Sequence, residues 1–192
     1  MAEERLERDA VYITTDRSGC FLFTASQTQS CDDEQARGEP LRAGMLTLHR
    51  IGADGVVAPG AAQRVVTDRF AHGVAVHSNN RTVFVSHCAP TSAIAVLSFA
   101  ADAGQSSPPL TMRSWVRAGD VRHLAFHPSR PLLFANDQGG SSVITFSVSD
   151  EGGLTRLHEQ STLPEGQVGV ANSSATVRVL ADGLVLATNR VS

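Results

Sequence analysis

Short apolar segments separated by turn-forming residues recur along the chain, and they are clearest in residues 121–148. In that stretch, apolar segments at 124–126, 132–135 and 143–148 are separated by the sequences HPSRP and NDQGGS. Both breaks consist of residues that favour turns, and the segments are too short and too closely spaced for helices. Polar and apolar side chains also alternate in the last segment, as in a half-buried strand. The pattern predicts a meander of three short antiparallel strands.

The same pattern occurs three more times. Residues 72–99 repeat it closely, residues 176–190 repeat part of it, and residues 11–26 with 43–55 repeat it around a polar insertion. When the repeats are aligned on the strand before the first turn, His72, Arg122 and Ala175 are 50 and 53 residues apart. Repeats of ~40–50 residues are typical of the four-stranded blades of a β-propeller.

We therefore expect an all-β fold, an incomplete β-propeller of four-stranded antiparallel blades. One partial propeller domain would occupy residues 1–192, with blade-like repeats at about 11–66, 72–117, 122–164 and 175–192. Polar residues at 27–41 and 101–109 lack periodicity, so we interpret them as surface connections.

Composition narrows the classes of function. The chain has 192 residues, of which 42% are hydrophobic, which is sufficient for a packed core. Its net charge is −3 and its arginines are scattered singly, which argues against a nucleic-acid partner. All 16 of its Lys and Arg residues are Arg, so Schiff-base and P-loop lysine chemistry are excluded. Anionic substrates would have to be bound by guanidinium groups.

Three cysteines, Cys20, Cys31 and Cys88, form no CxxC pair, so neither a disulfide framework nor a thiolate zinc site is indicated. The N-terminal sequence MAEERLERDA lacks the apolar centre of a signal peptide, and no run approaches the ~20 apolar residues of a membrane span. We expect a cytoplasmic protein with no membrane partner.

Three segments carry a resemblance to a known family: RHLAFHPSRPLLFAND, SSVITFSVSDEGGLTRLHEQSTLPEG and VRVLADGLVLATNR. They resemble successive motifs of the lactonase family of seven-bladed propellers, which includes bacterial 6-phosphogluconolactonases and fungal carboxymuconate-lactonizing enzymes. The resemblance runs from about residue 11 to the C-terminus and implies about three and a half of the seven blades. An internal or truncated portion would leave blade edges uncovered, so we expect the isolated chain to self-associate.

The resemblance also implies a site where the first strands of the blades converge. His72 corresponds to a His that leads an inner strand, and Arg122 to the Arg of the motif here written RHLAFHP. Asp137 occupies an acidic position of the family, and Arg190 ends an Asn-Arg motif. These four residues are the predicted catalytic groups. Arg122, Arg190 and the adjacent His123 are the predicted substrate-binding residues.

This set of residues suits the opening of a small anionic lactone. Guanidinium groups bind phosphate or carboxylate through paired hydrogen bonds and stabilise the oxyanion formed when water adds to the lactone carbonyl. A histidine can activate that water and then protonate the leaving alkoxide, so neither a metal nor a cofactor is expected.

Each candidate also has a structural interpretation. Arg122 could bind backbone carbonyls between blades, His72 could be a hydrogen-bonding core residue, and Asp137 could cap its own turn. Arg190 lies two residues from the last residue of the sequence, where even a correct motif can be frayed. His123 and His127 form an HxxxH pair, but His127 precedes a proline in a turn, so we do not expect them to share a metal.

Two classes of function remain. The first is an enzyme that opens a sugar-acid lactone with water, or runs a related lactonization. The second is a non-catalytic propeller fragment or binding scaffold. The fold alone does not separate them, since propellers host many functions.

Overall fold

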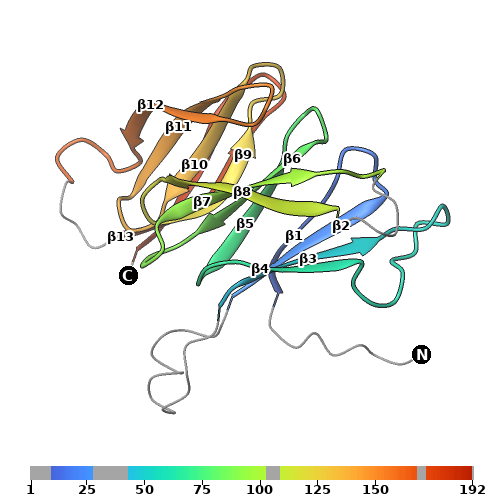
Figure 1. Ribbon diagram of the computed structural model, residues 1–192. Coiled ribbons are helices and arrows are strands. Elements are labelled where there is room, and N and C mark those ends of the chain that lie inside the picture. Colours follow the sequence, from blue (N-terminus) through green and yellow to red (C-terminus); the bar gives the residue numbers. More distant parts are fainter. Residues whose placement is uncertain (1–9, 28–42, 103–108, 168–171, 192) are drawn as a thin grey trace, which may run out of the picture.

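The computed structural model describes residues 10–27, 43–102, 109–167 and 172–191, whose strands form three four-stranded sheets and one two-stranded sheet (Figure 1). Within each sheet the strands follow one another in sequence order, and every neighbouring pair is antiparallel. No helix occurs among the residues described. The predictions of an all-β fold and of antiparallel blades are therefore confirmed.

We name the four sheets by their order in the chain. Blade I comprises β1 (Ala10–Thr15), β2 (Phe21–Ser26), β3 (Met45–Arg50) and β4 (Gln63–Val66). Blade II comprises β5 (Ala71–Val76), β6 (Thr82–His87), β7 (Ala93–Phe99) and β8 (Leu110–Arg117). Blade III comprises β9 (Val121–Phe126), β10 (Leu132–Asp137), β11 (Ser142–Val148) and β12 (Leu154–Ser161). The half-blade comprises β13 (Asn172–Val179) and β14 (Val185–Val191).

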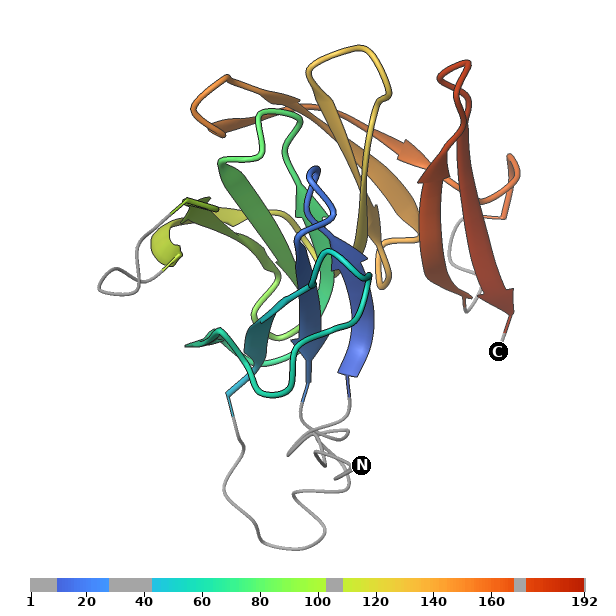
Figure 2. The same ribbon diagram turned by 90° about the vertical axis from the view of Figure 1, so that its right-hand side faces the viewer.

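The first strand of each sheet is its inner strand. Contacts join β1 to β5, β5 to β9 and β9 to β13, so the inner strands lie side by side in chain order. From there the sheets fan outward, as the two perpendicular views show (Figures 1 and 2). Residues about 50 positions apart in the sequence are thereby brought together along one axis.

The core lies between the blades because side chains of a strand point alternately to its two faces. On β6, Val83 and Val85 pack toward blade I, whereas Phe84 packs toward blade III. Both faces of blade II are covered, and all six residues of β5 and all six of β6 are buried. This double coverage explains why the two strands are mostly apolar and do not alternate with exposed polar residues.

Every inner strand has an irregularity of register near its beginning. In β5 the pairing with β6 skips from Ala71 to Val74, and in β10 the pairing with β9 skips between Ala135 and Asp137. Such a bulge places extra residues opposite a single partner and redirects their side chains. The bulged residues of β5 and β9 include His72 and Arg122.

Part of the predicted loops and one cysteine lie outside the described residues, namely positions 28–42, 103–108 and Cys31. Of the other cysteines, Cys20 is exposed, Cys88 is buried, and neither is in a disulfide. No helix in the described part of the chain is long and apolar enough to cross a bilayer.

Candidate functional site

Four of the five residues named as site candidates gather where the inner strands begin. His72 lies on β5, Arg122 and His123 lie on β9, and Arg190 lies on β14. The ring centroids of His72 and His123 are 5.1 Å apart, and the charge of Arg190 acts on the protonation of both rings and of Arg122. We call these four residues the axial cluster. Tyr12 of β1 adds an edge contact, with its centroid 5.1 Å from that of His123.

Glycine at position 73 permits the close approach of β5 and β9. A Cβ atom at Gly73 would lie 2.7 Å from the carbonyl oxygen of Arg122 and 2.7 Å from Oγ of Ser86. Carbon and oxygen atoms that are not bonded cannot approach so closely without one of them moving. The glycine therefore lets the backbones that carry His72 and Arg122 lie next to each other.

His72 is buried and neutral. Its side chain is 6% exposed, and its Nδ1 atom has no hydrogen-bond partner among the residues described. Burial, followed by the charges of Arg122 and His123, lowers the pKa of His72 to about 3. At neutral pH the ring is therefore uncharged, and one of its two nitrogens keeps a lone pair that can accept a hydrogen bond.

His123 is held by two contacts. Its backbone N–H donates to Oδ1 of Asn136 at 2.8 Å, and its Nδ1 lies 2.8 Å from Oγ1 of Thr176 in the half-blade. Burial, then the charges of Arg122 and Arg178, lowers the pKa of His123 to about 4. This ring is consequently also neutral at physiological pH, and its orientation is set by a neighbouring blade.

Both arginines of the cluster bind neutral partners. Arg122 donates from Nη1 to the carbonyl oxygen of Ala175. Arg190 donates from Nη2 to Oε1 of Gln138 at 2.9 Å and to Oγ of Ser173 at 2.8 Å. Among the described residues, no carboxylate forms an ion pair with either guanidinium. Each guanidinium has five donors, so both retain charge and hydrogen-bonding capacity for an anion.

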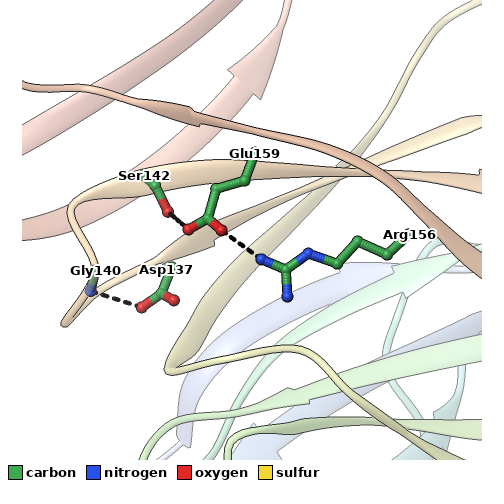
Figure 3. A network of polar contacts seen from close by, with 5 residues as sticks. All are labelled: Asp137, Gly140, Ser142, Arg156 and Glu159. Carbon is green, nitrogen blue, oxygen red and sulfur yellow. Dashed lines mark hydrogen bonds and ion pairs between the residues drawn. The ribbon is translucent and has the colours of Figure 1, made fainter.

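Asp137 lies at the end of β10 and binds its own hairpin. Its Oδ1 accepts a hydrogen bond from the backbone N–H of Gly140 at 2.8 Å (Figure 3). Burial raises the pKa of Asp137, with smaller increases from Asp120 and Glu159. No described contact joins this carboxylate to the axial cluster. The structural interpretation of Asp137 as a cap matches these contacts, and its catalytic role stays a prediction.

A neighbouring polar network lies on the outer strands of blade III. Oγ of Ser142 donates to Oε1 of Glu159 at 2.5 Å, and Arg156 pairs with the other oxygen of Glu159 (Figure 3). Arg156 and Glu159 are both on the partly exposed strand β12. This network stabilises the hairpin and lies outside the axial cluster.

The HxxxH pair does not form a metal site. Nδ1 of His127 accepts hydrogen bonds from the backbone N–H groups of Ser129 and Arg130 at 3.2 and 3.1 Å. Its ring therefore caps the turn after β9, whereas His123 faces the axis. In the described part of the chain, no three or more His, Cys, Asp or Glu side chains are placed to hold a metal ion.

Sequence reasoning did not identify three supporting residues, Ser86, Asn136 and Gln138. Gln138 binds Arg190, while Ser86 and Asn136 bind backbone groups of the inner strands. One signal was available for two of them. Ser86 and Asn136 are 136 − 86 = 50 positions apart, which is the repeat distance, and each follows a run of apolar residues in its strand.

The comparisons with known proteins agree with this architecture. The family described as "Lactonase, 7-bladed beta-propeller" matches residues 2–192. The chain is 27% identical over 157 residues to a 6-phosphogluconolactonase of Erwinia tasmaniensis, covering 81% of this chain and 42% of that protein. It is 28% identical over 142 residues to a 6-phosphogluconolactonase of Yersinia pestis, covering 73% of this chain and 37% of that protein.

The structure is also similar to that of the periplasmic gluconolactonase of Pseudomonas aeruginosa. The TM-score is 0.76 at 20% sequence identity, and the match covers 94% of this chain and 50% of the other. At this identity the similarity shows the fold alone. The chain spans half or less of the length of these relatives. This agrees with its three four-stranded sheets and one two-stranded sheet, about three and a half blades. Since the family match extends over nearly the whole sequence, the chain belongs to the lactonase family of seven-bladed β-propellers.

Proposed function

We propose that the axial cluster binds a small anionic lactone and opens it with water, as a lactone hydrolase of the 6-phosphogluconolactonase type. One observation carries this proposal: two arginines with no carboxylate partner in the described part of the chain lie beside a buried, neutral histidine whose Nδ1 has no hydrogen-bond partner there. The family membership and the names of the relatives support the same reaction class.

Binding would begin at the two guanidinium groups. A phosphate or carboxylate of the substrate can accept paired hydrogen bonds from Arg122 and Arg190, and it would offset their mutual repulsion. The same anion would raise the pKa of His72, because part of its lowering comes from the charge of Arg122. Substrate binding would therefore make His72 a stronger base.

The reaction needs only water and these side chains. A water oxygen bonds to the lactone carbonyl carbon while His72 accepts a proton from that water, and a guanidinium stabilises the resulting oxyanion. The ring C–O bond then breaks, and the leaving alkoxide takes the proton back from His72. The product is an open-chain hydroxy acid. His123, whose ring lies beside that of His72, would help to orient the substrate. The catalytic role predicted for Asp137 has less support because its carboxylate binds Gly140.

The proposal is tested by hydrolysis of 6-phosphogluconolactone and of a muconolactone. Arg122→Lys keeps the charge but loses the planar fork, so we expect a loss of roughly 2–4 kcal/mol in transition-state binding, or about 30- to 1000-fold in rate. His72→Ala should lower the rate by about 100-fold or more. Arg156→Lys, on the outer strand β12, is the matched control and should leave the rate unchanged.

A binding scaffold without catalysis is the second candidate, because the chain spans less than half of the curated relatives it matches. Equal turnover in wild type, Arg122→Lys and His72→Ala would favour the scaffold. A muconolactone preferred over the phosphorylated lactone would instead point to the related lactonizing activity. We propose the cytoplasm as the compartment, on the grounds of the cysteine pattern, although one structural relative is named as periplasmic.

Self-association is a further proposal about partners. Ile13 and Val66 of blade I are 62% and 65% exposed, and Leu184 after the last hairpin turn is 55% exposed. Apolar groups of this size favour contact with another protein surface over water. Light scattering at tens of micromolar should show species larger than a monomer, and a stable monomer would contradict the proposal.

A further inference from the structure

A single buried hydroxyl group lies between the strands that carry His72 and Arg122. Ser86 of β6 is 0% exposed. Its Oγ accepts a hydrogen bond from the backbone N–H of Gly73 at 2.9 Å and donates one to the carbonyl oxygen of Arg122 at 2.7 Å. One side chain therefore binds the residue after His72 and Arg122 itself.

Blade III repeats this arrangement one blade further along. Asn136 of β10 is also 0% exposed, and its Oδ1 accepts from the backbone N–H of His123 at 2.8 Å. Its Nδ2 donates to Oγ of Ser174 in the half-blade at 3.4 Å. At the same position of two successive blades, a polar side chain binds the bulge of its own inner strand and the next inner strand.

The bulges explain why a polar side chain is needed there. Residues 72 and 73 lie outside the regular pairing of β5 with β6, so the N–H of Gly73 has no ladder partner. A buried N–H left unpaired would destabilise the fold. Oγ of Ser86 also donates to the carbonyl oxygen of Arg122, so the hydroxyl that satisfies this N–H also links β5 to β9.

We propose that Ser86 is a positioning residue, whose hydroxyl holds His72 in register with Arg122 across the boundary between blades II and III. The inference rests on the proposed function of the axial cluster for its kinetic consequence. Ser86 itself does not touch the substrate. Its effect is exerted through the backbone of Gly73 and Arg122.

The test is Ser86→Ala, compared with Ser98→Ala as a matched control. Ser98 is on β7 of the same blade, and its Oγ donates to the carbonyl oxygen of Thr111 at 3.3 Å on an exposed face. Displacing a base from its substrate by about 1 Å can cost up to roughly 100-fold in rate, so we expect kcat to fall about 10- to 100-fold in Ser86→Ala. KM should change by less than about 3-fold, because the guanidinium groups remain, and neither constant should change in Ser98→Ala.

A second measurement separates this inference from the proposed function. An NMR titration of the His72 ring from pH 7 to 4.5 should show a neutral ring in the wild type and in Ser98→Ala. In Ser86→Ala the ring should begin to protonate within that range, because β5 and β9 would move apart and leave the ring less buried and further from the Arg122 guanidinium. If no variant or wild-type chain hydrolyses a lactone, the proposed function fails, and the titration still decides the role of Ser86.

An unchanged His72 titration in Ser86→Ala would overturn the inference, whatever the turnover. Should Ser86→Ala fail to fold, Ser86→Cys keeps a weaker donor and acceptor at the same position. The cysteine variant should shift the titration in the same direction by a smaller amount. A folded Ser86→Cys protein in which His72 titrates as it does in the wild type would also overturn the proposal.

Discussion

Blade II and the half-blade follow the same repeated pattern but differ in what covers them. Blade II packs on blade I with one face and on blade III with the other, so that β5 and β6 are buried throughout. In the half-blade, Val177 is 1% exposed, whereas Leu186 is 46% exposed. Apolar residues thus form strands in both sheets, but they contribute more to stability where a neighbouring blade buries them.

The comparison shows that the apolar core is concentrated at the boundaries between blades. Each boundary is formed by side chains of two different sheets, and a sheet with one free face contributes through its other face alone. The axial cluster is formed at the same boundaries. Damage to a covered face should therefore affect both the fold and the site, and damage to an exposed face should affect neither strongly.

The largest contrast is expected between Phe84→Ala in blade II and Leu186→Ala in the half-blade. Phe84 is fully buried between blades II and III, so its truncation should lower the free energy of unfolding by about 3–5 kcal/mol. Leu186→Ala removes a half-exposed side chain and should cost less than about 1 kcal/mol. Urea denaturation measures the unfolding free energy of both variants. Equal losses would contradict the larger contribution expected from the side chains buried between blades.

Gly73→Ala should be the next most damaging change. Its Cβ would meet the Arg122 carbonyl and Ser86 Oγ at 2.7 Å, so β5 and β9 would have to separate. We expect a loss of roughly 1–3 kcal/mol in unfolding free energy. Ala71→Gly, at the start of the same strand, is a comparison that changes β5 without adding volume. A Gly73→Ala protein as stable as the wild type would contradict the close approach of the two strands.

Three histidines whose pKa values are lowered by burial should make the stability of the fold depend on pH. In the fold the pKa is about 3 for His72 and about 4 for both His87 and His123, against about 6.5 in the unfolded chain. Between about pH 6.5 and 4, the unfolded chain binds protons that the fold excludes. The stability that these neutral rings provide is complete above about pH 6.5 and is lost as the pH falls.

Replacing one buried ring should therefore flatten the pH dependence. His72→Gln should reduce the slope of unfolding free energy against pH by up to roughly 1.4 kcal/mol per pH unit in that window. Ser98→Ala removes no group that titrates in this range, so it is the control and should leave the slope unchanged. Chemical denaturation at several pH values gives the slopes, and identical slopes in wild type and His72→Gln would mean that His72 is not shielded.

The smallest effect is expected at the outer strand. Arg156 and Glu159 form an ion pair with side chains that are 49% and 38% exposed, so solvent screens most of their attraction. Arg156→Ala should change the unfolding free energy by less than about 1 kcal/mol, and added salt should reduce that difference further. Glu159→Ala should cost more, because the buried hydroxyl of Ser142 would lose its acceptor. Thermal unfolding with and without salt compares the two.

The strands, their order and the repeat distance could be predicted from the sequence. Alternation of apolar residues and the chemistry of turns are local properties, and they located segments such as 124–126, 132–135 and 143–148 inside the observed strands β9, β10 and β11. The repeat spacing also placed His72 and Arg122 at the start of inner strands. This was possible because aligned repeats occupy equivalent places in a propeller.

The contacts and charge states of the site were decided by the tertiary structure. The ring of His72 lies 5.1 Å from that of His123 and is neutral because its burial lowers its pKa. The carboxylate of Asp137 binds the backbone N–H of Gly140 and contacts neither ring. The hydroxyl of Ser86 joins two strands whose bonded residues, 86 and 122, are 36 positions apart. Local sequence determines strands because their rules act between near neighbours. Burial, protonation and contacts across blades depend on residues far away in the chain, whose distances exist only after the blades have packed.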